Sequence, residues 1–404
     1  MAHFIADRLN YDDSDIFVTP FGGMCRVLLN KPRHKVECYN DYSSGLTALM
    51  RILSDPVRSV EFIHRLDDET SYSEEEFDRQ KIIFDSAEKD LEEQAKGHIR
   101  QLLISEKIVE PRNVRRLTNI ILQQTGEVEE KKDEVSSVVH KGLEKLQERL
   151  REDKEFSEVF QSYLADWIEA YRAKKENGIL MRSSDLGQYV SDMDLAIATY
   201  VVFSQSRDGM GKAFSGQKFD SNDQYKKRIV NLFDCAERLE GVEIFQIDAV
   251  DFFRRMMFVD ESTPLDDVPP QFSIMNEWIN NPRVMMYCDP SYISVKSEER
   301  LLKGIDIDNV DSLWSAIEER YEGKKKPENL GKIYAMSFGY DEQEKFLRCI
   351  QNARCKILVS NYDLKLYNKY LNESTGWRRE EFHTSTAIGG KKDNKRVEVI
   401  WYNY

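Results

Sequence analysis

The chain has 404 residues, of which 41% are apolar and 32% are charged, and its formal net charge is −14. This composition is that of an ordinary globular protein, long enough for about two domains. No stretch reaches the roughly 20 continuous apolar residues that a membrane helix needs, and the N-terminus lacks a basic-then-apolar signal pattern. We therefore expect a cytoplasmic protein without membrane contact. The net acidity counts against a sequence-independent polyanion binder, and the six scattered cysteines, with no histidine at ligand spacing, count against a metal site.

The first sixty residues predict a strand, a turn and a helix. An apolar run at 16–18 ends in the turn TPFGG at 19–23, and a second run at 35–39 ends in Asn40-Asp41. Residues 46–53 then show the spacing of a helix. Strands that end in glycine or aspartate and lead into helices are typical of parallel β-α units.

A mainly helical insert is predicted next. Between about 73 and 175, charged stretches carry apolar residues three and four positions apart, as at Val135, Val139, Leu143, Leu146 and Leu150. This is the pattern of amphipathic helices. The helices either pack simply against the body of the protein or provide a contact for a homodimer or for a protein partner.

The α/β pattern returns after a polar, glycine-containing loop at 204–220. Aspartates follow two of the later apolar runs, at Asp248 and Asp289. Polar residues at the carboxyl ends of strands are what an open α/β sheet presents at its ligand crevice. We therefore predict an α/β sheet that the helical insert splits in sequence. Its later strands are expected at 242–247, 284–287, 332–338, 356–360 and 397–404.

The turn after the first strand is a candidate cofactor site. Glycines at this position let a ligand approach the backbone, and the turn consists of Pro20, Phe21, Gly22 and Gly23. About twenty residues later, Asp41 could accept hydrogen bonds from ribose hydroxyls. An ordinary tight turn and a solvated strand end are the simpler interpretations, but together the two features favour a nucleoside-bearing cofactor.

The stretch Asp289-Pro290-Ser291-Tyr292 is a candidate site for a planar amino group. A carboxylate and the carbonyl before a rigid turn provide two acceptors for two N–H bonds, and the aromatic ring provides a face for stacking. A plain β-turn is the alternative, because aspartate and then proline are favoured at its first two positions.

Taken in order, these segments resemble one known family. TPFGGMCRVLLNKPRHKVECYNDYSSGLTALMRIL (19–53) is similar to the cofactor-binding start of the Dam-type N6-adenine DNA methyltransferases, particularly of their phage and prophage branch. YCDPSYI (287–293) resembles their catalytic Asp-Pro-Pro-Tyr turn, and ILVSNYD (357–363) and RVEVIWYNY (396–404) resemble their late strands. The likeness extends over nearly all of the chain except roughly 80–195.

The resemblance implies a Rossmann-like methyltransferase sheet and the cofactor S-adenosyl-L-methionine. The glycine turn at 20–23 would lie against the cofactor, with Asp41 on its ribose hydroxyls and Asp248 towards its adenine end. The start of the chain, MAHFIADRLNYDD, does not match the basic, glycine-containing segment of the type K-W/Y-x-G-G-K that relatives have before the first strand. Three single positions also depart from the family pattern. Cys25 stands where relatives have glycine, Arg26 where they have a small residue, and Ser291 where they have a second proline.

The resemblance also implies how DNA is used. Asp289 and Pro290 would hold the N6 amino group of a target adenine, and Tyr292 would stack on the flipped base. Arg207 and Lys212, in the polar loop, would contact phosphates.

Three parts of the chain receive roles on this basis. Residues 1–65 would belong to the cofactor-binding part, 66–200 to a helical insert for target recognition or partner binding, and 201–404 to the catalytic part. The expected activity is methylation of adenine N6 in DNA. The alternatives are a catalytically impaired protein of the same fold that binds DNA or a partner, and methylation of another exocyclic amine or of RNA.

Overall fold

The computed structural model describes most of the chain, and its parts fall into two compact units. The first unit comprises residues 1–77 and 199–404, and the second comprises residues 78–198. The described residues are 2–9, 13–126, 137–177, 181, 191–207, 209, 211–257, 278–322, 338–385 and 395–404.

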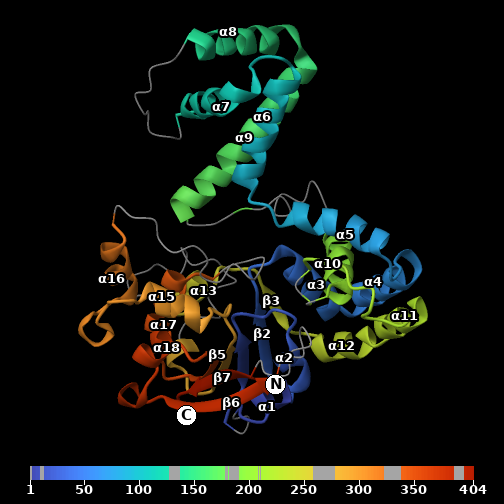
Figure 1. The fold of residues 1–404 in the computed structure, drawn as a ribbon. Coiled ribbons are helices and arrows are strands. Elements are labelled where there is room, and N and C mark those ends of the chain that lie inside the picture. The colour runs from blue at the N-terminus through green and yellow to red at the C-terminus, as the bar shows by residue number, and fades with distance from the viewer. Residues whose placement is uncertain are drawn as a thin grey trace. The chain divides into compact units, whose positions relative to one another are not determined.

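The first unit is an α/β structure built on a mixed seven-stranded sheet (Figure 1). The strand order is β3-β2-β1-β4-β5-β7-β6, in which the first five strands are parallel and β7 runs antiparallel to both of its neighbours. The strands are β1 (Ile16–Thr19), β2 (Val36–Asn40), β3 (Glu243–Phe245), β4 (Val284–Cys288), β5 (Lys356–Tyr362), β6 (Arg378–Ser385) and β7 (Lys395–Tyr402).

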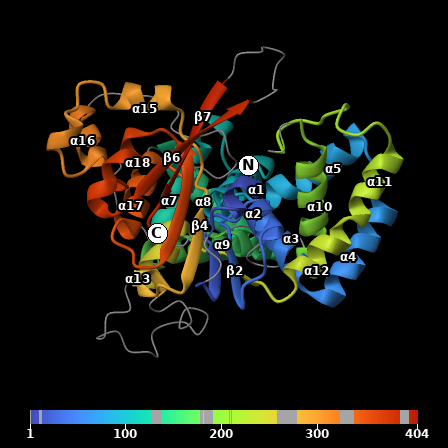
Figure 2. The ribbon, with the colours of Figure 1, turned by 90° about the horizontal axis from the view of Figure 1, so that it is seen from below.

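Helices cover both faces of this sheet. Figure 2 shows α13, α17 and α18 on one side of the strands and α2 and α3 on the other. The helices of this unit are α1 (Ala2–Ala6), α2 (Arg26–Asn30), α3 (Ser44–Ser54), α4 (Pro56–Glu69), α11 (Asn222–Val230), α12 (Leu232–Leu239), α13 (Ala249–Met257), α15 (Val295–Leu301), α16 (Leu313–Arg320), α17 (Tyr340–Ile350) and α18 (Lys365–Tyr370), with short 3-10 turns at η4 (Trp278–Asn280), η5 (Ile307–Asn309) and η6 (Glu373–Thr375).

The second unit is helical. It contains α6 (Leu91–Ser105), the 3-10 turn η1 (Pro111–Asn113), α7 (Val114–Gln123), α8 (Ser137–Glu152) and α9 (Lys154–Asn177) around one apolar core. Within it α6 packs beside α9, and α7 packs against α6 and α8. Two further helices, α5 (Glu74–Ala87) and α10 (Asp192–Gln205), run across the unit boundaries.

The strands expected from apolar runs are confirmed for β1, β2, β3, β4, β5 and β7. The run expected at 332–338 lies, apart from Phe338, outside the described residues. The sequence analysis missed β6, because its residues, RREEFHTS, are mostly charged or polar. This strand pairs along its whole length with β7 at the edge of the sheet.

The edge strand β6 contacts the start of the chain. Its first four residues, 378–381, are all charged. Arg8 forms an ion pair of 2.6 Å with Glu380, and the Phe4 ring lies 4.9 Å from the Phe382 ring. Glu380 and Phe382 are alternate residues of the strand, so these contacts attach the N-terminal helix α1, which also packs beside α2, to one face of β6.

The central strands are buried on both faces, because helices lie on each side. All five residues of β4 are buried, and alternate residues such as Met286 join a core that contains Phe252 of α13 and Leu347 of α17. Strands buried in this way appear in sequence as continuous apolar runs. This is why β4 could be recognised before the structure was known.

Two buried glutamates accept hydrogen bonds at the N-termini of helices that are distant from them in sequence. Glu298 accepts hydrogen bonds from the backbone of Lys365 (2.8 Å) and Leu366 (2.9 Å) at the start of α18. Glu344 accepts from Leu313 (2.9 Å) and from its neighbour at the start of α16. Each carboxylate satisfies N–H groups that a helix start leaves without partners.

A buried ionic cluster fixes β2 to α2 and α12. Glu37 accepts hydrogen bonds from Lys31, from the His34 backbone (3.0 Å) and from both terminal nitrogens of Arg238 (2.6 and 3.0 Å). Burial alone would raise the pKa of Glu37, but the bonds from Arg238 and Lys31 outweigh it and hold that pKa below its ordinary value. Burial lowers the pKa of Lys31 to about 8.

His34 completes this cluster as a neutral ring. Its Nδ1 lies 2.8 Å from Lys31 Nζ, and its Nε2 has no hydrogen-bond partner in the described structure. Burial, and then the charge of Lys31, lower the pKa of His34 from 6.5 to about 4.

We predict that His34→Asn flattens the pH dependence of stability. The unfolded chain binds a proton at His34 near pH 6.5, whereas the folded protein does so only near pH 4. The unfolded chain therefore holds more protons in this interval, so stability falls as the pH is lowered through it, by up to about 3 kcal/mol. Denaturant unfolding of both proteins at pH 7 and pH 4.5 measures the difference. If acidification lowers the free energy of unfolding of the wild type and of the variant equally, His34 is not the cause of this pH dependence.

Candidate active site

The glycine turn after β1 is built around the ring of Tyr39. Gly22 N–H donates to the carbonyl of Asn40 (2.7 Å), and the Tyr39 hydroxyl donates to the carbonyl of Gly23 (2.8 Å). A Cβ atom at Gly22 would lie 2.0 Å from the Tyr39 ring, so glycine is required there. Gly23 has a φ of +51°, and a Cβ at this position would meet nothing within 4 Å. This side of the turn is open.

The Asn40 side chain joins the ends of three strands. Its amide nitrogen donates to the carbonyls of Pro20 and Ile247, each at 2.9 Å, and its oxygen accepts from the Ile247 N–H at 2.9 Å. Asn40 is 1% exposed. A buried amide with these bonds satisfied fixes the carboxyl ends of β1, β2 and β3 relative to one another.

Asp41 lies at the end of β2 and supports the glycine turn. Its Oδ2 accepts from Gly23 N–H (2.8 Å), and its Oδ1 accepts from Ser43 N–H (2.8 Å) at the start of α3. These two bonds connect the glycine turn to the start of α3 through one carboxylate. The predicted ribose contact is compatible with this position, and the bond to Gly23 is a second role that the sequence did not indicate.

The other residues predicted to bind the cofactor are buried or already make contacts within the protein. Pro20 is buried, and Phe21 is half-buried against the rings of Phe338 (5.0 Å) and Phe346 (5.3 Å). Asp248 follows β3 and begins α13, where its Oδ1 accepts from the Val250 backbone at 2.9 Å. Capping a helix is therefore a demonstrated structural role of Asp248.

Cys25 adopts the backbone conformation that glycine favours. It has a φ of 45° and a ψ of 30°, in the left-handed region, where side chains other than glycine's cost roughly 1–2 kcal/mol. Its side chain is buried, with Sγ 3.6 Å from the sulfur of Met50. The thiol thus points into the core, and burial raises its pKa.

Asp289 follows β4 and is held by hydroxyl groups. Ser360, in the middle of β5, donates from its hydroxyl to Asp289 Oδ1 at 2.8 Å. The hydroxyl of Tyr287 lies 3.0 Å from the same serine oxygen. Because β4 and β5 are parallel neighbours, the polar side chain of one strand reaches the carboxylate at the end of the other.

The Asp289 carboxyl is solvent-accessible yet largely surrounded by protein. This desolvation raises its pKa, while hydrogen bonds from Ser360, Tyr292 and Tyr287 act in the opposite direction. An accessible carboxyl with a raised pKa is typical of functional sites. The arrangement suits a group that accepts hydrogen bonds from a ligand.

The remainder of the Asp289 turn is fixed by Gln343 and leaves one acceptor unused. Gln343, which is fully buried on α17, donates to the carbonyl of Ser291 at 2.7 Å. The carbonyl of Pro290 accepts no hydrogen bond within the part of the chain that the structure describes. Tyr292 is half-buried, and its ring meets that of Tyr362 edge-on at 4.8 Å.

The two candidate turns leave neighbouring strands at the same edge of the sheet. Val18 of β1 pairs with Met286 of β4, and Phe21 and Asp289 each lie three residues beyond this pair. Among the five parallel strands, numbering increases outward from this pair, through β2 and β3 on one side and through β5 on the other, so this pair is the point where the connections diverge. Ligands of open α/β sheets bind at such a point, outside the carboxyl ends of the strands.

Arg207 and Lys212 lie on a short hairpin that follows α10. Ser206 pairs with Phe214 in an antiparallel bridge, and Arg207 N–H donates to the carbonyl of Ala213 (2.9 Å). Both charged side chains are exposed. Within the described residues, no hydrogen bond, ion pair or ring contact joins either side chain to the two turns. A second locally basic stretch, GGKKDNKR at 389–396, is also a candidate for DNA contact, and apart from its last two residues it lies outside the described residues.

Three residues of the site were not identified from the sequence. Ser360 is a hydroxyl residue that directly follows the apolar run at 357–359, and this was the available signal. Tyr362 ends the same strand. Gln343 gave no signal, because a glutamine in an amphipathic helix is ordinary and only the fold brings it to Ser291.

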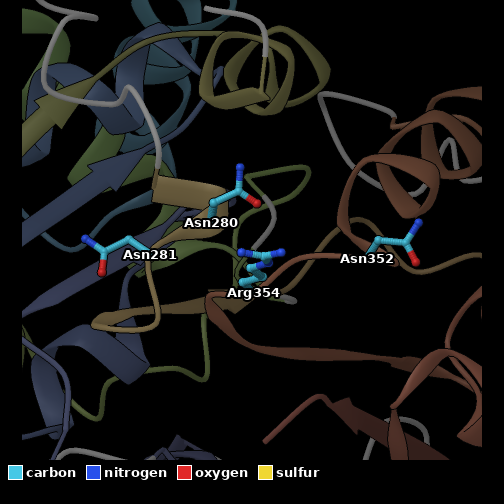
Figure 3. A pocket seen from close by; sticks show the side chains of 4 residues that line it. All are labelled: Asn280, Asn281, Asn352 and Arg354. Atoms are coloured by element: carbon cyan, nitrogen blue, oxygen red, sulfur yellow. The ribbon is translucent and has the colours of Figure 1, made fainter.

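A polar hollow lies at the opposite edge of the sheet. It measures about 700 Å³ and is lined by Asn280, Asn281, Asn352 and Arg354. These residues precede β4 and β5, whereas Asp289 follows β4. In Figure 3 their polar ends point in different directions and converge on no common point. We therefore place the candidate site at the carboxyl edge.

We predict that Gly22→Ala destabilises the protein much more than Gly23→Ala. The new methyl group at Gly22 would overlap the Tyr39 ring, and overpacking costs about 1–3 kcal/mol or more. At Gly23 only the positive φ opposes alanine, at about 1 kcal/mol. Guanidinium unfolding midpoints measure both. A Gly22→Ala midpoint equal to that of the wild type would mean that Tyr39 can move away.

Comparisons with known proteins give no further assignment. No protein-family model matches the chain, and no curated protein is significantly similar to it. Among the described helices, none is both long and apolar enough to cross a membrane.

Proposed function

We propose that this protein transfers a methyl group from S-adenosylmethionine to the N6 amino group of adenine in DNA. The main support is the adjacency of the glycine turn after β1 and the Asp289 turn after β4, at the divergence point of the sheet. The order of its first five strands is the doubly wound order of Rossmann-like folds, which bind nucleoside cofactors at this point.

The glycine turn suits a nucleoside cofactor. The open side of Gly23 would let a ligand approach the backbone closely, and Asp41 offers carboxylate oxygens beside it. Cys25 is compatible with this use, because its side chain is buried against Met50. When bound, the cofactor would supply a methyl group that is already activated by a positively charged sulfur.

The Asp289 turn suits a planar amino group. The Asp289 carboxylate and the Pro290 carbonyl offer two acceptors for the two N–H groups, and Tyr292 offers an aromatic ring. When these two oxygens accept hydrogen bonds from both N–H groups, the nitrogen is drawn out of conjugation with the ring and its lone pair becomes available for attack. The nitrogen would form the new N–C bond as the C–S bond breaks, the bonding electrons would pass to sulfur, and one amine proton would leave to water.

Alignment and electrostatics would supply most of the rate enhancement. The nitrogen, methyl carbon and sulfur must lie in line, which the two fixed turns favour. The amine becomes positively charged during transfer, and the Asp289 carboxylate would stabilise that charge. Adenine must leave the base stack to reach the turn, at a cost of a few kcal/mol.

Asp289→Ala is expected to reduce methyl transfer by roughly 100-fold or more, because an acceptor for the developing charge is lost. The assay measures labelled methyl groups transferred from S-adenosylmethionine to unmethylated DNA. Ser291→Pro is the matched control in the same turn, and it should retain most activity, since the acceptors belong to the two residues that precede it, Asp289 and Pro290. Detection of modified bases in the product names the methylated atom.

Two outcomes would contradict the proposal. If the wild-type protein binds no S-adenosylmethionine in calorimetry, the cofactor assignment is wrong. If it binds the cofactor but labels no DNA, the protein has the fold without the activity.

Ser360→Ala is expected to move the acid limb of the pH–rate profile to higher pH. The Ser360 hydroxyl donates to Asp289, and this bond lowers a pKa that burial has raised. Without it the carboxylate would take up a proton at higher pH, and the protonated form cannot accept both amine hydrogens. Rates measured from pH 5 to 9 at saturating substrates test this shift. Ser360→Thr keeps the hydroxyl and should leave the profile unchanged.

A further inference from the structure

The helix α7 of the helical unit has two sharply different faces. Val114, Leu117, Ile120 and Ile121 are buried in the core of that unit. On the other side Arg115, Arg116 and Asn119 are exposed, and Gln123 is partly exposed. A stable helix is thus held by its apolar side while its polar side is presented to solvent.

The polar side of α7 is positively charged, as is expected of a surface that binds an anion. No acidic residue occurs within α7, whereas α6, α8 and α9 each carry several. Arg112, just before the helix, forms an ion pair of 2.9 Å with Glu110. Arg115 forms no ion pair or hydrogen bond with any other residue that the structure describes. Its charge is therefore not neutralised by a described neighbour.

The residue types on this face are those that read base edges. Arginine donates two hydrogen bonds to guanine, and asparagine or glutamine pairs with adenine through two hydrogen bonds in the major groove. Arg115 and Asn119 are four residues apart, about 6 Å along the helix axis. That spacing is about two base-pair steps of B-DNA, so both side chains could reach base pairs in one groove.

We infer that the exposed face of α7, consisting of Arg115, Arg116 and Asn119, enters the major groove of duplex DNA and selects its sequence. This inference rests on the proposed function for the choice of DNA as the partner. Its support on this helix is independent of the catalytic turn. The side chains extend from a packed helix, so they lose less freedom on binding than they would from a loop.

The experiment measures sequence preference in binding, not methylation. The full-length protein is incubated with a library of random duplexes, bound DNA is sequenced, and affinities for the preferred and for scrambled duplexes are measured by anisotropy. The variants are Arg115→Gln and Asn119→Ala. The matched control is Lys141→Gln, which removes one exposed positive charge from α8 of the same unit. Melting temperatures establish that all variants are folded.

Arg115→Gln and Asn119→Ala should each weaken binding to the preferred duplex by roughly tenfold and change the selected bases at one position. Binding to scrambled duplexes should change less than threefold, and Lys141→Gln should leave the preference unchanged. An equal loss of affinity for all duplexes would overturn the inference, because it would mean that α7 contacts only phosphates. Wild-type preference in both variants would also overturn it.

The two proposals can fail separately. If Asp289→Ala selects the same duplexes as the wild type while no methyl transfer is detected in either, the methyltransferase proposal fails and α7 readout stands. If methylation occurs at defined sites and the α7 variants methylate the same sites at the same rate, the readout inference fails alone.

Discussion

The parallel pairing of β1 with β4 is the constraint on which the rest of the candidate site depends. It joins segments more than 260 positions apart in sequence, and it places the ends of both strands at one edge. The connection after β1 leads towards one face of the sheet and that after β4 towards the other. The two turns therefore separate as they leave the strands, at the position where open α/β sheets bind their ligands.

Buried polar side chains hold each turn from behind. Asn40 ties the glycine turn to the ends of β2 and β3, and Gln343 ties the Asp289 turn to α17. Both amides are almost fully buried. Buried polar groups cost free energy unless they are bonded, so these amides specify one arrangement of the turns. The Pro290 carbonyl has no such bond in the described structure, and the proposed function uses it as an acceptor.

The sequence predicted those strands whose burial produces an apolar run within a single segment. β1, β4 and β5 each contain a continuous apolar run, and Asp289 was noticed because an acid follows the run in β4. β6 escaped notice, since an edge strand requires little apolar surface and its pattern RREEFHTS resembles a solvated loop. Ser360 is important only through its distance to Asp289, and that distance follows from the register between β4 and β5. No pattern within one segment contains such information.

The charged start of β6 also has a consequence for the protein in concentrated solution. The outer strand of an open sheet offers unpaired N–H and C=O groups, to which a strand of another molecule can add. Four consecutive charged residues at 378–381 make such an addition unfavourable, because an incoming strand would have to place its own side chains beside these charges. The edge of the sheet therefore carries, in the same residues that hid it from sequence analysis, a feature that opposes aggregation through strand addition.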